Sequence, residues 1–114
     1  MPTCVDLAGA KYPAEFAGQN IQPMEGISLA PAFEGQTLRR SKPIFWEHEG
    51  NRAIRAGDWK LVSKHLGGWE LDDLATDRTE MHDLATMQSE RVTEMTAQWE
   101  AWASRVGVMP WPQP

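Results

Sequence analysis

Titratable side chains gather at two places in this sequence, and the first could be imagined as a metal site. Glu47, His48 and Glu49 are consecutive, and His65 and His82 follow further along the chain. Neighbouring residues of a β-strand point to opposite faces, so Glu47 and His48 cannot easily face one ion. The sequence also lacks the H-x-x-x-H and C-x-x-C spacings of common metal sites. We interpret these side chains as surface residues and predict no metal site.

The second group surrounds His82, where Glu80 and Asp83 could support general acid–base catalysis. A carboxylate can orient an imidazole for proton transfer. The preceding residues 77–80, Asp-Arg-Thr-Glu, are instead typical of a turn, and two apolar side chains, Met81 and Leu84, could anchor that turn to a sheet. The turn is the interpretation that we favour.

The single cysteine and a pair of tryptophans also have chemical interpretations. A reactive thiolate needs a basic neighbour or a helix N-terminus, and no cation lies near Cys4 in the sequence. We predict that Cys4 is a small buried side chain on a short helix. Trp99 and Trp102 lie at helical spacing, which favours a position in the core over an aromatic ligand box.

Size and composition predict one globular domain with a modest core. The chain has 114 residues, of which 41% are hydrophobic and 24% charged, as in folded proteins. Its formal net charge is -5 and it has no run of Lys or Arg, which argues against a nucleic-acid partner or an anionic membrane surface. No stretch approaches the roughly 20 apolar residues of a membrane span. Residues 1–10 lack the features of a signal peptide.

The middle of the chain predicts an antiparallel sheet. Residues 44–48, 52–55, 59–63 and 69–74 form short apolar and polar runs, and turns that contain glycine separate them. Such runs are typical of a four-stranded meander. One face of this sheet would carry Trp46, Ile54, Trp59 or Leu61, and Leu71, and it would require a covering layer.

A long helix from about Ser89 to Arg105 is predicted to supply that layer. Its apolar residues recur at offsets of 3, 4, 3 and 4 residues and fit one helical stripe: Val92, Met95, Trp99, Trp102 and Val106. Ser89 is the candidate N-cap, and Gly107 marks the expected end. The fold class is therefore α+β, a four-stranded antiparallel sheet covered on one face by a long C-terminal helix.

Short helical segments are predicted before the sheet. Residues 2–10 indicate a short helix, residues 11–26 an extended polar connection, and residues 28–35 one or two helical turns. Ser28 is a candidate N-cap and Gly35 a left-handed stop. After the long helix, residues 109–112 contain two prolines and are expected to pack as an extended strip.

Three stretches, in this order, carry a resemblance to a known family. They are MPTCVDLAG at residues 1–9, GISLAPAFEG at residues 26–35, and FWEHEGNRAIRAGDWKLV at residues 45–62. WEL at residues 69–71 and DRTE at residues 77–80 follow them. Together they resemble the end of bacterial arylsulfatases of the formylglycine-dependent sulfatase family, in the alkaline-phosphatase-like superfamily.

The resemblance implies a place in a larger protein. Sulfatases of this family have a large α/β catalytic domain followed by a smaller four-stranded sheet with a C-terminal helix. Residues 1–114 would be that C-terminal subdomain, with 1–35 a truncated N-terminal helical and linker segment, 44–74 the sheet and 89–106 the helix. The family nucleophile lies in a Cys/Ser-x-Pro-x-Arg motif, whereas Val-Asp-Leu-Ala follows Cys4. We therefore predict no catalytic residue here, and expect calcium and formylglycine only in a full-length parent.

The same resemblance places one turn of the sheet near the mouth of the active-site cleft. His48, Glu49, Asn51 and Arg52 are accordingly the candidate substrate-lining residues, on the leaving-group side of the substrate. The alternative is that they only build the hairpin, because Gly50 followed by Asn51 suits a tight turn and charged neighbours keep a sheet edge soluble.

Separation from a catalytic domain would leave apolar side chains exposed around Val5, Leu7, Leu29 and Phe33. Such a patch tends to find a partner. We therefore expect two kinds of partner, a sulfatase catalytic domain and a second copy of this chain in a two-fold dimer. The compartment stays open, since relatives are often periplasmic or secreted and any leader would lie in the missing part.

Two functions of different classes stay open at this point. In the first, the chain is a structural buttress and cleft wall of a sulfuric ester hydrolase and is inactive by itself. In the second, it is a stand-alone interaction module with the same fold. An independent metalloenzyme is a weaker third hypothesis.

Overall fold

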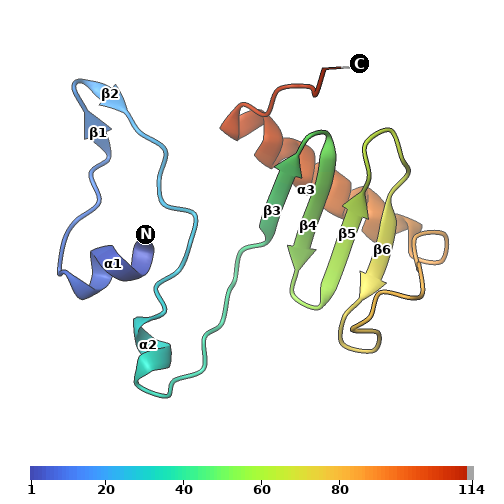
Figure 1. Cartoon of the computed structure of the whole chain (residues 1–114), viewed down its shortest axis with the longest axis horizontal. Helices are drawn as coiled ribbons and strands as arrows, with labels where there is room; N and C mark the ends of the chain where they lie inside the picture. The colour runs from blue at the N-terminus through green and yellow to red at the C-terminus, as the bar shows by residue number, and fades with distance from the viewer. Residues whose placement is uncertain (113–114) are drawn as a thin grey trace. The chain divides into compact units, whose positions relative to one another are not determined.

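The fold is described from a computed structural model, which places residues 1–112 (Figure 1). The chain divides into two compact units, Met1–Arg40 and Ser41–Pro114. Within the described residues, no helix has the length and apolar character needed to cross a membrane.

The N-terminal unit contains α1 (Pro2–Leu7), β1 (Glu15–Phe16), β2 (Gln19–Asn20) and α2 (Ala30–Phe33). Both predicted helical segments are present, though shorter than expected. Ser28 Oγ accepts the N–H of Ala30 at 3.1 Å, although Leu29 holds the N-cap position. The β1–β2 hairpin corrects the prediction of a plain extended connection. Ala17 and Gly18, at φ 51° and 76°, form its two-residue turn.

None of the side chains in residues 1–40 is buried. Leu7, Leu29 and Phe33 are exposed as predicted, and Val5 is half-buried. The prediction of a buried Cys4 is wrong, because the thiol lies exposed on α1. Two short helices and a hairpin with strands of two residues offer too little surface to cover one another, so this unit has no core of its own.

The C-terminal unit contains the predicted meander. Its strands are β3 (Ile44–His48), β4 (Asn51–Ala56), β5 (Trp59–Ser63) and β6 (Glu70–Asp73), and each pairs antiparallel with the next. The first and third strands have the predicted bounds, and the other two differ by one residue at each end. With α3 (Ser89–Val106) packed on the sheet, the predicted α+β class is confirmed (Figure 1).

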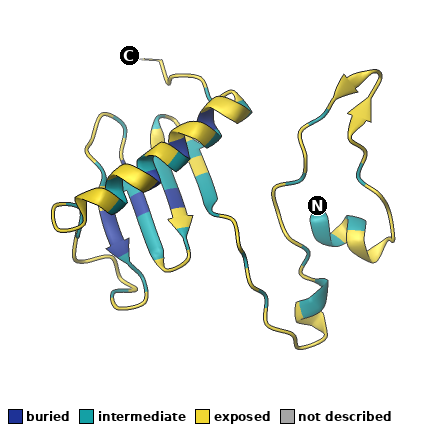
Figure 2. Cartoon of the chain, turned by 180° about the vertical axis from the view of Figure 1, so that it is seen from behind, coloured by how far each residue is buried: buried dark blue, intermediate teal, exposed yellow. Residues whose placement is uncertain are grey.

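The core lies between α3 and the inner face of the sheet. The register aligns Phe45, Ile54, Leu61 and Leu71 across the four strands. The last three are completely buried, and α3 contributes Met95, Trp99 and Ala103 to the same core. Figure 2 shows the buried residues along the side of α3 that faces the strands.

The prediction that Trp46 lies on the core face of the sheet is wrong. Trp46 follows Phe45 in β3, so its side chain points to the opposite, outer face, where it is 47% exposed. Phe45 takes the inner position instead and stacks on Trp102, with ring centroids 5.2 Å apart. Trp59 and Leu61 both lie on the inner face, as predicted, and Lys60 between them points to the outer face.

The helix ends are close to those predicted. Gln88, not Ser89, holds the N-cap position of α3, and it makes no side-chain cap hydrogen bond. Gly107 ends the helix in the left-handed conformation at φ 74°, as expected.

Hydrogen bonds from outside the sheet reach both of its outer strands. At β3, the indole Nε1–H of Trp99 donates at 3.0 Å to the backbone oxygen of Trp46, which the hairpin register directs toward β4. At the β6 edge, the N–H of Leu71 donates to Asp83 Oδ1 at 2.9 Å, and its C=O accepts the N–H of Leu84 at 2.8 Å. These bonds tie α3 and the 83–84 segment to the sheet.

Candidate functional site

The β3–β4 turn carries the four candidate substrate-lining residues. Glu49 and Gly50 are its two central residues, with φ 53° and 78°. Positive φ at both positions is the geometry of a type I′ hairpin turn. The carboxylate of Glu47 accepts the N–H of Gly50 at 2.9 Å. The turn therefore lies at Glu49 and Gly50, one residue earlier than the pair expected from sequence.

Asn51 holds this turn together. Its Nδ2 donates to the backbone oxygen of His48 at 2.8 Å, and its Oδ1 accepts the N–H of His65 at 3.1 Å. Because both ends of the amide are occupied, Asn51 links the β3–β4 turn to the segment that follows β5.

Arg52 points to the inner face of the sheet. Its guanidinium carbon lies 4.4 Å from the ring centroid of Trp69 and 5.6 Å from that of Trp99. Its Nη2 donates to Ser63 Oγ at 2.9 Å. These are cation–π and hydrogen-bond contacts that fix the side chain within its own unit.

His48 and Glu49 are the two most exposed residues of the set. Their side chains are 81% and 58% exposed, and His48 Nδ1 lies 3.9 Å from Glu49 Oε2. Of the four candidates, these two are the ones that a molecule from solution meets first.

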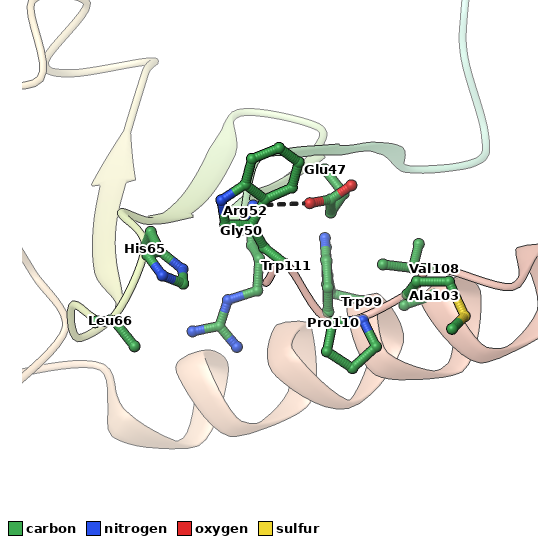
Figure 3. A pocket seen from close by; sticks show the side chains of 11 residues that line it. Glu47, Gly50, Arg52, His65, Leu66, Trp99, Ala103, Val108, Pro110 and Trp111 are labelled. Atoms are coloured by element: carbon green, nitrogen blue, oxygen red, sulfur yellow. Dashed lines mark hydrogen bonds between the residues drawn. The ribbon is translucent and has the colours of Figure 1, made fainter. Parts of the chain in front are cut away.

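Two hollows flank the hairpin, one on each side of the sheet. The inner hollow has a volume of about 440 Å³, and Glu47, Arg52, His65, Trp99 and Trp111 are among its lining residues (Figure 3). The outer hollow has a volume of about 380 Å³, and its lining includes Trp46, His48, Asn51, Val62 and Lys64.

The structure thus divides the predicted set. His48 and Asn51 border the outer hollow, and Glu49 borders neither hollow. Arg52 borders both, with its guanidinium on the inner side. The alternation of side chains along a strand gives the signal for this division. His48 pairs with Asn51 across the hairpin, so Arg52, the next residue, points to the other face of the sheet.

Sequence reasoning missed several lining residues, among them Lys64, His65 and Trp111. His65 packs so close to the turn that a Cβ added at Gly50 would lie 2.2 Å from its Nδ1. Neither its distance in sequence nor its type gives a signal of this contact. The 108–111 tail also lines the inner hollow.

The carboxylate beside the His82 imidazole is that of Asp77, whereas the sequence suggested Glu80 and Asp83. No three His, Cys, Asp or Glu side chains within residues 1–112 come together as metal ligands. Around His82, the Asp77 carboxylate accepts the N–H groups of Thr79, Met81 and His82, and it lies 3.0 Å from His82 Nδ1. The turn interpretation is confirmed. Leu84 packs on the core as predicted, whereas Met81 is exposed and anchors nothing.

Two carboxyl groups of this region have opposite pKa shifts. Burial raises the pKa of Asp72 from its ordinary value of 3.8, Glu80 and Asp83 raise it further, and Lys60 offsets part of this. Desolvation also raises the pKa of Asp77, but hydrogen bonds from His82, Met81 and Thr79 outweigh it, so the net pKa is far below its usual range. Asp77 is therefore a charged turn organiser, whereas the charge on Asp72 is unfavourable.

Comparison with known proteins finds a sulfatase similar to this chain. No protein-family model matches the sequence. An uncharacterized sulfatase of the fission yeast Schizosaccharomyces pombe is 29% identical over 116 residues, which cover 96% of this chain and 21% of that protein. The chain is thus similar to a sulfatase along almost all of its own length.

Solved structures also match this chain. The crystal structure of Ps i-CgsB matches with a TM-score of 0.65 and 28% identity, over 90% of this chain and 22% of that one. BT4656, solved in complex with its substrate D-glucosamine-2-N,6-O-disulfate, matches over 99% of this chain with a TM-score of 0.62. Its 20% identity supports the fold alone. The chain spans about a fifth of the length of the sulfatase relative.

Proposed function

We propose that this chain is the C-terminal part of an arylsulfatase-type sulfuric ester hydrolase, where it supports the catalytic domain and forms one wall of the active-site cleft. One observation carries the proposal: the match runs along 96% of this chain but only 21% of a sulfatase. Such a match is expected of a part of the enzyme. In this proposal the nucleophile, with formylglycine and calcium, belongs to the catalytic domain.

The exposed tip of the β3–β4 hairpin would meet the substrate. His48 and Glu49 present their side chains to solvent there, so they would contact the leaving-group side directly. Both ends of the Asn51 amide are hydrogen-bonded within the chain, and the Arg52 guanidinium packs on Trp69 with its Nη2 on Ser63. These two residues would therefore position the tip rather than bind substrate.

The first test is catalysis by the chain alone. We expect purified protein to release no 4-nitrophenol from 4-nitrophenyl sulfate, with or without calcium, because Cys4 lacks the following Pro and Arg of the sulfatase motif. Turnover that co-purifies with the chain through two chromatographic steps would overturn the proposal.

A chimera tests the supporting role. This chain would replace the matching fifth of the fission-yeast sulfatase, and we expect a soluble protein that unfolds as one unit. A chimera in which the body aggregates, while the isolated chain stays folded, would favour the stand-alone interaction module.

The lining role is tested in the same chimera. We expect His48→Ala to raise KM more than it lowers kcat, because the side chain would contact substrate without joining the chemistry. His82→Ala is the matched control, since its imidazole is equally exposed at 81% but lies on another segment. Equal effects of the two substitutions would contradict the lining role.

A further inference from the structure

His65, a half-buried residue that follows β5, contacts the β3–β4 turn in two ways. Its backbone N–H donates to Asn51 Oδ1 at 3.1 Å, and Asn51 Nδ2 donates in turn to the backbone oxygen of His48 at 2.8 Å. Its imidazole lies against Gly50 (Figure 3), where an added Cβ would be 2.9 Å from the imidazole Cγ and still closer to Nδ1. His65 therefore reaches the turn through both its backbone and its ring.

The imidazole supports the turn by packing rather than by hydrogen bonding. Its Nε2 is buried and has no hydrogen-bond partner within residues 1–112. A buried nitrogen without a partner costs free energy, so the position of the ring is set by its shape and by its neighbours. Gly50 is one of these neighbours, and a larger residue there would displace the ring.

The segment that carries His65 is itself fixed to the sheet. The N–H of Gly67 donates to the backbone oxygen of Lys64 at 2.8 Å, which closes a turn around His65. Ser63 Oγ donates to the backbone oxygen of Gly67 at 3.0 Å and accepts Arg52 Nη2 at 2.9 Å. Because the end of β5 is held in this way, the imidazole has a firm base from which to hold the hairpin.

The turn that His65 contacts has a backbone conformation that needs support. Glu49 lies at φ 53°, in the left-handed region that few residues other than glycine adopt. Such a conformation persists where the surrounding structure fixes it. Inside the turn, the Glu47 carboxylate accepts the N–H of Gly50 at 2.9 Å. From outside the hairpin, His65 supplies further contacts.

We propose that His65 is a positioning residue, which holds the β3–β4 turn so that His48 and Glu49 present their side chains to the substrate. This inference rests on the proposed function and adds to it a residue from outside the hairpin. His65 does not contact the substrate in this proposal. It acts through the two residues at the tip.

Hydrogen exchange of the Gly50 amide in the isolated chain tests the contact. His65→Ala removes the ring but keeps the backbone N–H, so we expect this exchange to increase about tenfold. His65→Leu keeps a side chain of similar volume without the nitrogens and should stay within about twofold of the unmodified chain. Gly57→Ala is the matched control, because it strains the other tight turn, at φ 63°, and should leave Gly50 unchanged. Unchanged Gly50 exchange in His65→Ala would overturn the inference.

Kinetics of the chimera with the fission-yeast sulfatase body test the positioning role. We expect His65→Ala to raise KM for 4-nitrophenyl sulfate about threefold to tenfold with little change in kcat. His65→Leu should restore KM, and Gly57→Ala should leave it unchanged. Combining His48→Ala with His65→Ala should raise KM by less than the product of the two single effects, because one residue acts through the other.

The outcomes separate this inference from the proposed function. If His48→Ala raises KM and His65→Ala does not, the positioning role is wrong and the proposed function stands. If the two effects multiply fully, His65 acts independently of the tip, which also contradicts the inference. If His48→Ala leaves KM unchanged, the lining role in the proposed function fails. Exchange of the Gly50 amide then decides by itself whether His65 holds the turn.

Discussion

At the scale of single residues, Arg52 is the candidate site residue whose surroundings are most completely determined. Two indole rings and a serine hydroxyl hold its guanidinium. Ser63 Oγ in turn donates to the backbone oxygen of Gly67 at 3.0 Å. Arg52 thus connects β4, β5 and the segment after β5, and we assign it to stability rather than to substrate contact.

Replacing Arg52 tests that assignment. Arg52→Met keeps much of the aliphatic bulk but removes the cation–π contacts and the bond to Ser63, so we expect the unfolding free energy to fall by about 1–3 kcal/mol. Urea denaturation of the isolated chain measures this change in unfolding free energy. Arg55→Met is the control, because that exposed side chain bonds to the nearby Gly57 oxygen, and the stability lost on its replacement should stay below about 0.5 kcal/mol. Similar losses for both would contradict the assignment.

Asp72 gives a prediction on pH. Its pKa is raised in the folded state by burial and by neighbouring carboxylates, so the folded protein binds this proton more tightly than the unfolded chain does. Asp72 therefore lowers stability at neutral pH, and this cost disappears as pH falls through the folded-state pKa toward 3.8.

We expect Asp72→Asn to raise the thermal midpoint at pH 7, with a gain that shrinks as the pH is lowered toward 4. Asp77→Asn is the opposite case. The lowered pKa of Asp77 means that its carboxylate stabilises the fold above the unfolded-state value and loses this effect below it, so the variant should lower the midpoint at pH 7. A gain for Asp72→Asn that does not depend on pH would refute the electrostatic explanation.

At the scale of elements, the sequence predicts the strands better than their faces. Glycine-containing turns separate β3, β4 and β5, so their bounds follow from the pattern. The face of β3 does not, because Ile44, Phe45 and Trp46 are three consecutive apolar residues without alternation. Pairing of Phe45 with Ile54 and stacking on Trp102 decide it, and both contacts come from other elements.

The candidate site shows the same limit. A two-residue turn pairs His48 with Asn51, and alternation along β4 then places Arg52 on the face opposite to His48. The partners of Arg52 are not predictable in this way, because Trp69 and Trp99 lie 17 and 47 residues further along the chain. The β1–β2 hairpin was missed because strands of two residues are too short to show a period.

The two tight turns of the meander offer a matched pair of glycine substitutions. Gly57→Ala introduces a Cβ at φ 63° in open space, so we expect a loss of about 1 kcal/mol from the backbone conformation alone. Gly50→Ala adds a clash with the His65 ring at 2.2 Å, so the loss should be about 1–3 kcal/mol greater. Chemical denaturation of both variants measures the difference. Equal losses would mean that the His65 ring moves aside freely.

At the scale of the whole molecule, the two units differ in what holds them. The C-terminal unit has six buried apolar residues from three strands and α3, whereas no side chain of residues 1–40 is buried. A segment that buries little apolar surface gains little to offset the conformational entropy of its backbone. The exposed side chains of Leu7, Phe16 and Phe33 are therefore available for association.

We expect the isolated chain to form a dimer through this unit. Light scattering after size-exclusion chromatography should give twice the monomer mass at high concentration, and Leu7→Ser combined with Phe33→Ser should restore the monomer. Leu66→Ser is the control, because Leu66 is equally apolar and 76% exposed but lies in the C-terminal unit. A monomeric unmodified chain at high concentration would contradict this prediction.

The hydrogen bonds at the β6 side of the meander also affect aggregation. A strand with open backbone groups is a template on which another chain can add a strand, and repeated addition produces fibrils. Here the 83–84 segment takes both backbone groups of Leu71 on the outer side of β6. Ladder growth from the β6 side is blocked at this position. Addition of a strand at β6 is therefore disfavoured relative to contacts between side-chain surfaces.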